Sequence, residues 1–481
     1  MYKRNLILLV LTLNSIFAKK PNILFIAVDD LVPNLGCYND SVSISPNIDH
    51  LASMGTTFLH AQCQWPVCGP SRASIMSGLR PESSGVMDLK TKWREANPKI
   101  VSLPQYLKKF GYFTTGTGKI YDYRCVENKQ TMDEESWSEA FIFMPSNPRT
   151  DVARKASNAA KRPYKSLAVN NYDGPLTDFP DYRIVQKGIE RMRERAESKQ
   201  PFFLAVGFKK PHLPFLSPTK FWNLYKREGF KIHPYQQKST HNSGFGYWKM
   251  SEIRTYQPIP RIGSGNSFPE DLQKKLIHGY YACVSWVDSL VGMLIQELET
   301  LGLQKNTIVI LWGDHGFHLG DKGLWGKHTP FENASRTPLI IVDPRINNKN
   351  SKTESPAELT DIYPTLCELV GIPIPNSLEG VSLVSALKNK NAKPRKGAIT
   401  LYKSKGAYGY SIRNERYRYI EWIDLKTKKV VGKDLFDYAL DPYESENLAK
   451  NKDYLDILLK MTSILHEDTR GWKVLEKSLN Q

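Results

Sequence analysis

Acidic side chains follow two apolar runs of the chain, at positions where they could hold a metal ion. Asp29 and Asp30 come directly after the run NILFIAV, and Asp314 and His315 follow TIVILW and one glycine. Three carboxylates and one further ligand at two strand ends suit Ca²⁺ or Mg²⁺ better than zinc, which favours nitrogen and sulfur donors. An Asp pair after a strand also occurs as a loop or a helix cap, but the second pair favours the metal site.

The stretch CGPSRASIMSG, residues 68–78, carries a second group of reactive side chains. Such a short motif also fits a buried thiol ahead of a turn and a helix. The stretch resembles the sulfatase signature, in which the cysteine is oxidised after synthesis to formylglycine. The resemblance implies that Cys68 is a precursor: one hydroxyl of the hydrated aldehyde attacks sulfur, and the other then expels sulfate.

Four basic side chains are candidates for the same site. Arg72 lies one helical turn after Cys68, where it could orient the hydrated aldehyde. A helix beginning after the proline of that motif would direct its positive N-terminal end toward the sulfate. Lys119 and Lys327 could neutralise charge that grows on the ester, although a lone lysine is usually solvated surface. His212, between two prolines in KKPHLPF, could protonate the leaving alkoxide as a positioned general acid.

Most of these side chains stand at the ends of short apolar runs that we interpret as buried strands, over residues 22–28, 111–115, 201–208 and 307–312. Helical patterns occur between them, the clearest over 272–301 and a charge-rich one over 181–197. Apolar strands that alternate with helices indicate an α/β fold with a mostly parallel sheet covered on both faces. In such folds ligands bind beyond the carboxyl ends of the strands, where the candidate side chains stand.

The chain has 481 residues, of which 41% are hydrophobic and 24% charged, as suits a globular protein with a large core. A basic start and a short apolar run predict a signal peptide over residues 1–18, so the mature protein is expected to be exported and soluble. No later segment has the ~20 apolar residues that span a membrane. We expect a catalytic domain over 19–375 and a C-terminal subdomain over 376–481.

The formal net charge is +17, which would suit an anionic partner. The basic residues are dispersed without a long Lys/Arg block, so nucleic acid is the weakest candidate. A sulfated or uronic-acid-rich glycan agrees best with both the charge and the Cys68 motif. A basic surface that only keeps the protein soluble is the alternative.

Nearly the whole mature chain resembles the formylglycine sulfatases of the alkaline-phosphatase superfamily, and within them the iduronate-2-sulfatase-like group. The likeness runs from NILFIAVDDL and CGPSRASIMSG through GYFTTGTGKIY and PFFLAVGFKKPHLPF to LWGDHGFHLGDKGLWGKHTPFE. It implies an alkaline-phosphatase-like, mostly parallel sheet flanked by helices, with a smaller C-terminal antiparallel sheet. It also implies one Ca²⁺, with Mg²⁺ less favoured, and active-site basic residues. The implied metal ligands are Asp29, Asp30, Asp314, His315 and the modified Cys68, and the implied basic residues are Arg72, Lys119, His212 and Lys327.

One position departs from the family pattern. Shortly after the lysine that corresponds to Lys119 the family usually has a His, which is thought to help the diol release sulfate. This chain has IYDY instead, and Asp122 falls where that His would be. Either Tyr121 or Asp122 could replace it, so the turnover step or its pH dependence is expected to differ.

The leading hypothesis is an exported carbohydrate sulfatase, periplasmic or secreted, and lysosomal only in an animal. The resemblance suggests a 2-O-sulfated uronic acid or a similar sugar of an acidic sulfated polysaccharide, either a glycosaminoglycan or an algal polysaccharide such as ulvan. A formylglycine-generating maturation enzyme is an expected partner, whereas nucleic acid and membrane insertion are not expected. The alternatives are a phosphomonoester or phosphonate ester hydrolase of the same superfamily and a catalytically silent homologue that only binds the glycan.

Overall fold

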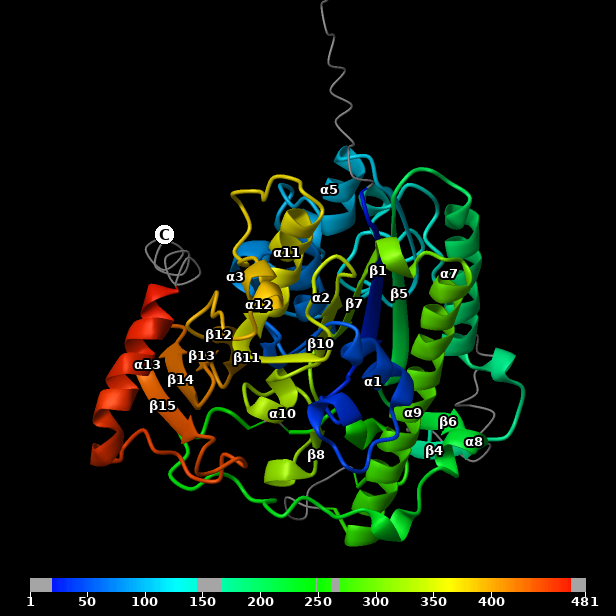
Figure 1. Ribbon diagram of the computed structural model, residues 1–481. Coiled ribbons are helices and arrows are strands. Elements are labelled where there is room, and N and C mark those ends of the chain that lie inside the picture. Colours follow the sequence, from blue (N-terminus) through cyan, green and yellow to red (C-terminus); the bar gives the residue numbers. More distant parts are fainter. Residues whose placement is uncertain (1–19, 145–165, 248, 261–267, 469–481) are drawn as a thin grey trace, which may run out of the picture.

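A seven-stranded sheet in the order β11-β2-β10-β7-β1-β5-β3 forms the centre of the computed structural model, which describes residues 20–144, 166–247, 249–260 and 268–468 (Figure 1). Its parallel half consists of β1 (Asn22–Asp29), β3 (Phe113–Gly118), β5 (Phe202–Pro211) and β7 (Thr307–Gly313). β2 (Thr56–Gln62) and β11 (Ser351–Glu358) are parallel to each other, and β10 (Leu339–Val342) is antiparallel to β2 and β7. The mostly parallel sheet is therefore confirmed, and the predicted signal peptide, residues 1–18, lies outside the described residues.

Both faces of this sheet are buried, which explains why β1 and β7 are apolar along their middle positions, from Ile23 to Val28 and from Ile308 to Trp312. In β1, Leu24 and Ile26 pack into one core, and Ile23 and Phe25 pack into the other. Helices supply many of the other residues of each core, and Figure 1 shows them on the two sides of the sheet. The first face is covered by α1 (Pro46–Ser53), α7 (Pro180–Ala196) and α9 (Glu270–Thr300). The opposite face is covered by α2 (Cys68–Ser77), α5 (Leu103–Lys109), α11 (Ile362–Leu369) and α12 (Val384–Lys388).

The predicted helices α7 and α9 and three of the four predicted strands lie close to their expected bounds. The bounds predicted for β3, residues 111–115, are wrong, because the strand runs from Phe113 to Gly118. Its glycines resemble strand terminators in sequence but are required by the packing of the sheet. A Cβ atom on Gly118, which has a φ of +82°, would lie 2.2 Å from the carbonyl oxygen of Gly207 on β5.

The C-terminal region forms the expected antiparallel sheet, in the order β12-β13-β14-β15. Its strands are β12 (Ala398–Ser404), β13 (Ala407–Arg413), β14 (Tyr417–Asp424) and β15 (Val430–Asp437). On one face α13 (Leu455–Glu467) packs Met461 and Leu465 into a small core. On β14, the buried Arg418 donates to Gln62 of β2 at 3.2 Å, so this sheet is bonded directly to the large one. The domain division at residue 375 stays a prediction.

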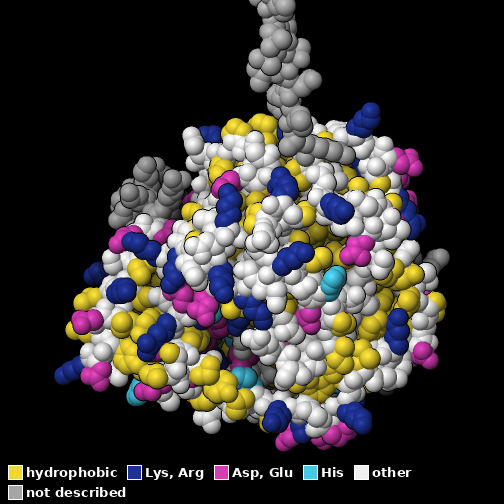
Figure 2. Space-filling view, in the orientation of Figure 1, with side chains coloured by type: hydrophobic (Ala, Val, Ile, Leu, Met, Phe, Trp, Pro, Cys, Tyr) yellow, Lys and Arg dark blue, Asp and Glu magenta, His cyan; other side chains and the backbone are white. Residues whose placement is uncertain are grey.

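Besides several 3-10 turns, the remaining α-helices and strands of the described residues are short. They are α3 (Pro81–Ser84), α4 (Trp93–Ala96), α8 (Thr219–Trp222), α10 (Glu332–Ser335), the parallel pair β4 (Val169–Tyr172) and β6 (Phe215–Pro218), and the antiparallel pair β8 (His318–Leu319) and β9 (Trp325–Gly326). Within the described part of the chain, no helix combines the length and apolar character needed to cross a membrane. On the face in Figure 2, Lys and Arg side chains are scattered among acidic and uncharged ones.

Candidate active site

The ends of β1 and β7 lie side by side, since Val28 pairs with Gly313 in the parallel register. Asp30 follows β1 with a φ of +59°, in the left-handed region that Asp tolerates better than most residues. Its amide donates to Oδ1 of Asp314 at 3.0 Å, and its carbonyl accepts from the Tyr280 hydroxyl at 2.7 Å. These bonds hold the acidic residues of the two strand ends against each other.

Four of the predicted metal ligands form one buried cluster. The ligand atoms of Asp29, Asp30, Cys68 and His315 all lie within 4.8 Å of one another. Asp314 is not part of that group of four, but its Oδ2 lies 3.7 Å from Nε2 of His315. Three buried carboxylates with two further donors fit Ca²⁺, which prefers several oxygen ligands.

Cys68 is the first residue of the ten-residue helix α2 and is 2% exposed. The prediction that this helix begins after Pro70 is wrong, and its positive end therefore coincides with Cys68 itself. The Cys68 sulfur lies 3.3 Å from Nε2 of His315 and 3.7 Å from Nζ of Lys327. Burial and the neighbouring Asp29 raise the pKa of the thiol well above its ordinary value, so the unmodified side chain is a poor nucleophile.

Arg72 lies beneath the cluster and joins three strand ends. Its Nε lies 2.9 Å from Oδ2 of Asp314, and its Nη2 lies 3.2 Å from Oδ1 of Asp29. Its Nη1 donates to the carbonyl oxygens of Lys119 and, at 3.1 Å, Ile120. The buried guanidinium thus orients two of the carboxylates.

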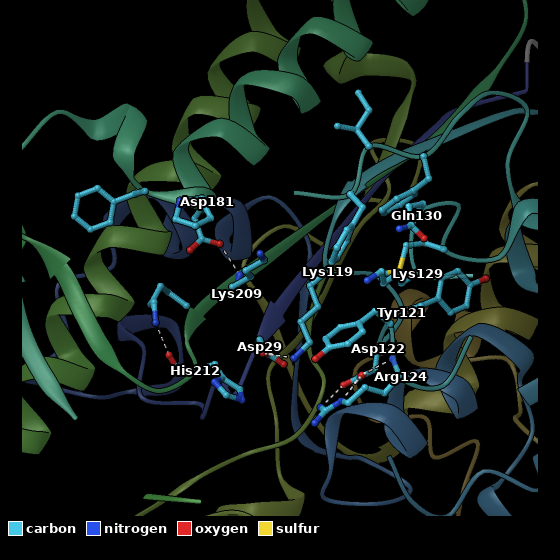
Figure 3. A pocket seen from close by; sticks show the side chains of 18 of the residues that line it. Asp29, Lys119, Tyr121, Asp122, Arg124, Lys129, Gln130, Asp181, Lys209 and His212 are labelled. Atoms are coloured by element: carbon cyan, nitrogen blue, oxygen red, sulfur yellow. Dashed lines mark hydrogen bonds and ion pairs between the residues drawn. The ribbon is translucent and has the colours of Figure 1, made fainter. Parts of the chain in front are cut away.

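Three further cations converge on the first two carboxylates. Nζ of Lys119, after β3, lies 2.5 Å from Asp29, and Nζ of Lys327, after β9, lies 2.9 Å from Asp30. His212 follows β5, and its Nε2 lies 3.9 Å from Asp30. Figure 3 shows His212 and Lys119 near Asp29. Burial alone would raise the pKa of Asp29, but nearby cations, with Lys119 foremost, hold it well below its usual range.

Glu252 was not predicted from the sequence. Its Oε1 lies 3.3 Å from Nε2 of His212, and its Oε2 lies 3.3 Å from Nζ of Lys327. Burial and Lys327 act to lower the pKa of His212, but Asp30 and Glu252 contribute to a net rise. Glu252 stands in the run KMSEIRTY, which has neither apolar periodicity nor a motif, so only the folded chain reveals the contact.

Asp122 and Tyr121, the two candidates to replace the family His, have different surroundings. Arg124 donates to both carboxylate oxygens of Asp122, at 2.8 and 2.7 Å. Burial would raise the pKa of Asp122, but Arg124 and Lys119 lower it to about 2. The Tyr121 hydroxyl is 2.6 Å from that of Ser136, inside an aromatic core. Of these two candidates, Asp122 is therefore the one that is ionised.

A cavity of about 970 Å³ adjoins this cluster and includes Asp29, Lys119 and His212 in its lining (Figure 3). This volume is at the upper end of the range typical of small-molecule sites. Apolar side chains, among them Phe141 and Phe143, line part of the wall. Among the described residues of the lining, cationic side chains outnumber carboxylates. The cations are Lys119, Arg124, Lys129, Arg191, Lys209 and Lys210, and the carboxylates are Asp29, Asp122 and Asp181.

Comparison with known proteins agrees with this geometry. Residues 21–372 match the family model described as Sulfatase, and residues 320–470 match the one described as N-sulphoglucosamine sulphohydrolase, C-terminal. A sulfatase of Formosa agariphila is 34% identical over 465 residues, covering 94% of this chain and 88% of the relative. The iduronate 2-sulfatase of Mus musculus is 33% identical over 386 residues, covering 74% of this chain and 69% of the relative.

Solved structures share the fold. A protein in complex with its substrate D-glucosamine-2-N,6-O-disulfate superposes with a TM-score of 0.74 at 22% identity, covering 95% of this chain and 98% of that one. A phosphonate monoester hydrolase of Agrobacterium radiobacter also gives 0.74, at 21% identity over 93% of this chain and 96% of its own. The chain thus shares its fold, a mostly parallel sheet flanked by helices with a smaller antiparallel sheet, with these two structures. Because the Sulfatase model matches most of its length, the chain belongs to the sulfatase family of sulfuric ester hydrolases.

Proposed function

We propose that the protein is an exported carbohydrate sulfatase that removes sulfate from an acidic sulfated polysaccharide or its oligosaccharides. The observation that carries the proposal is the position of Cys68, at the start of α2 and within the cluster of carboxylates and cations. The likeness to an iduronate 2-sulfatase supports a 2-O-sulfated uronic acid, in a glycosaminoglycan or in an algal polysaccharide such as ulvan. The net positive cavity supports an acidic substrate.

The metal cluster suits one Ca²⁺, with residue 68 as formylglycine. The aldehyde hydrate would supply the nucleophile, and the ion would polarise a sulfate oxygen as a Lewis acid. Asp29, Asp30, Asp314 and His315, with residue 68, would hold the ion. Arg72 fixes the orientation of Asp29 and Asp314 through its bonds of 3.2 and 2.9 Å.

The remaining basic side chains act on the ester. Lys119 and Lys327 stand beside the carboxylates, where they neutralise negative charge that develops on the sulfate oxygens. His212 donates the proton to the departing sugar alkoxide. Its Nδ1 lies 2.8 Å from the carbonyl oxygen of Leu213, so Nε2 is the nitrogen available for that transfer.

Peptide mass spectrometry across residue 68, on protein expressed with a formylglycine-generating maturation enzyme, tests the proposal together with a screen for sulfate release. We expect formylglycine at residue 68 and sulfate released with the glycan chain uncut, and neither in Cys68→Ala. Activity only on phosphate or phosphonate esters would overturn the proposal in favour of the other hydrolase of this fold. An unmodified thiol, together with glycan binding without turnover, would instead identify a silent homologue.

Export and domain organisation belong to the same proposal. A signal peptide over residues 1–18 would be removed, and N-terminal sequencing of the exported protein should begin at Lys19. The protein would then act in the periplasm or outside the cell, or in a lysosome if the source is an animal. The catalytic domain would span 19–375 and the C-terminal subdomain 376–481.

A further inference from the structure

Lys209 is a cation of the cavity that the reaction does not use. Its ammonium donates to the carbonyl oxygen of Met144 and lies 5.9 Å from the centre of the Phe143 ring. Within residues 20–144, 166–247, 249–260 and 268–468, no carboxylate forms an ion pair with it. A lysine ammonium has three donors, so two remain for a ligand.

Four of the other five cations of the lining have a carboxylate partner or two hydrogen bonds. Lys119 pairs with Asp29, Arg124 with Asp122, and Arg191 with two glutamates. The Lys210 ammonium donates to two carbonyl oxygens, at 2.6 and 2.5 Å, and these bonds brace the loop around His212. The sixth cation, Lys129, is exposed to solvent. Among the five less exposed cations of this wall, Lys209 is therefore the one with neither a carboxylate partner nor a second hydrogen bond in the described part of the chain.

The surroundings of Lys209 contain more positive than negative charge. Asp181 and Arg183 of α7, Lys119 after β3 and the adjacent Lys210 are the charged groups that act on it. The Asp181 carboxylate accepts from the backbone amide of Lys209 at 2.5 Å. Burial and the three neighbouring cations lower the pKa of Lys209 to about 8, against the opposing effect of Asp181. An anion placed here would relieve this repulsion.

We propose that the ammonium of Lys209 binds a second anionic group on the sugar whose sulfate ester is cleaved, either a carboxylate or a further sulfate. Lys209 lies three residues before His212, and both line the cavity that Lys119 also lines (Figure 3). A sugar that reaches Lys119 and His212 with its sulfate ester would thus have another substituent within reach of Lys209. The inference rests on the proposed function and adds a requirement for two negative charges on one substrate.

The test compares kcat/KM for two small substrates, a 2-O-sulfated uronic acid and the corresponding 2-O-sulfated hexose, which lacks the carboxylate. In Lys209→Gln we expect a loss of about tenfold to a hundredfold on the uronic acid, the range of a charge-assisted hydrogen bond, and less than about twofold on the hexose. Lys209→Arg should retain the preference, and Lys187→Gln, on α7 with a side chain 40% exposed, is the matched control. An equal loss on both substrates would overturn the proposal.

The pH dependence provides a second readout. The preference for the uronic acid over the hexose should decline as the pH rises through about 8, because the Lys209 ammonium loses its proton. In Lys209→Arg this preference should persist. A preference unchanged to pH 10 in the wild type would contradict the proposal. A hexose that carries two sulfates and no carboxylate distinguishes the two possible anionic groups. If its turnover depends on Lys209 and that of the uronic acid does not, the subsite binds a second sulfate.

A binding measurement separates this proposal from the proposed function. Titration calorimetry of glucuronate and of glucose onto the Cys68→Ala protein requires no turnover. Glucuronate that binds at least tenfold more tightly than glucose, with the difference lost in Lys209→Gln, would support the subsite even if no sulfate ester were cleaved. Equal binding of the two sugars in both proteins would count against it.

Discussion

Oε1 of Glu252 lies 3.3 Å from Nε2 of His212, the nitrogen that faces Asp30. The same carboxylate approaches Lys327, so one acidic side chain fixes the spacing of two cations that stand on different loops. Since Nδ1 of His212 is occupied by a backbone carbonyl, this contact sets the direction in which the imidazole can donate its other proton. Glu252 is therefore a positioning residue for the proposed acid.

Glu252→Gln should lower kcat on a sugar sulfate by about tenfold or more, a part of the 10²–10⁴ that a general acid contributes. The effect on 4-nitrophenyl sulfate should be much smaller, because that leaving group needs no proton. Glu252→Asp should recover part of the activity, and Glu197→Gln, at an exposed position on the surface, should change neither rate. Equal losses on both substrates would indicate a general structural defect instead.

Ca²⁺ should stabilise the folded chain through the cluster of Asp29, Asp30 and their neighbours. At a hundred times its Kd a ligand that binds only the native state adds about 2.7 kcal/mol, which should raise Tm by several degrees. Asp30→Asn should abolish most of this increase, whereas Asp173→Asn, at an exposed position, should keep it. Scanning calorimetry with chelator and with added Ca²⁺ gives the comparison, and an equal increase in both variants would place the ion elsewhere.

Gly207→Ala should damage both stability and activity. A Cβ atom there would lie 2.1 Å from the carbonyl oxygen of Lys119 and 2.8 Å from its amide nitrogen, and backbone cannot move aside as a side chain can. We expect a loss of about 3 kcal/mol in the free energy of unfolding, at the upper end for overpacking, and displacement of the Lys119 ammonium. Gly229→Ala, where no atom lies within 4 Å, is the control in urea unfolding. Similar stabilities of the two variants would contradict the prediction.

Asp122→Asn should destabilise the protein by about 2 kcal/mol at neutral pH, because folding lowers the pKa of Asp122 from its ordinary value of 3.8 to about 2. A lowered folded pKa means that this stabilisation is complete above about pH 4 and is lost as the pH falls through about 2. The difference between variant and wild type should thus shrink to about 1 kcal/mol at pH 3. Urea unfolding at pH 7 and pH 3 checks this. A difference that is the same at both values would show that the ion pair with Arg124 contributes nothing.

The sequence predicts the cluster well because a parallel sheet brings the carboxyl ends of its strands to one edge. Asp29 and Asp314 are 285 positions apart in the printed chain, yet pairing of their strands makes them neighbours. To apply this rule, it is enough to recognise which segments of the sequence form the parallel strands. The order of the strands was not predicted; in the structure β3 and β5 are neighbours, and Lys119 and His212, which follow them, line the same cavity.

The contacts that the sequence does not predict depend on packing between loops. Glu252 reaches the site from an irregular segment whose path is set by the side chains around it, so no periodicity marks it. The bounds of β3 were misplaced for a related reason. A glycine is required at position 118 because Gly207 on the next strand lies so close to it. Local propensity cannot predict such a contact between strands.

Because Cys68 is buried, any enzymatic modification of its thiol would have to occur before the chain folds. At 2% exposure, with α2 packed over the sheet, the thiol is out of reach of any modifying enzyme once the chain has folded. Conversion to formylglycine would then compete kinetically with folding, and each molecule would keep whichever state it held when the core closed. A preparation would thus contain a fixed ratio of active and inert copies, set by relative rates during synthesis and unchanged by later treatment of the native protein.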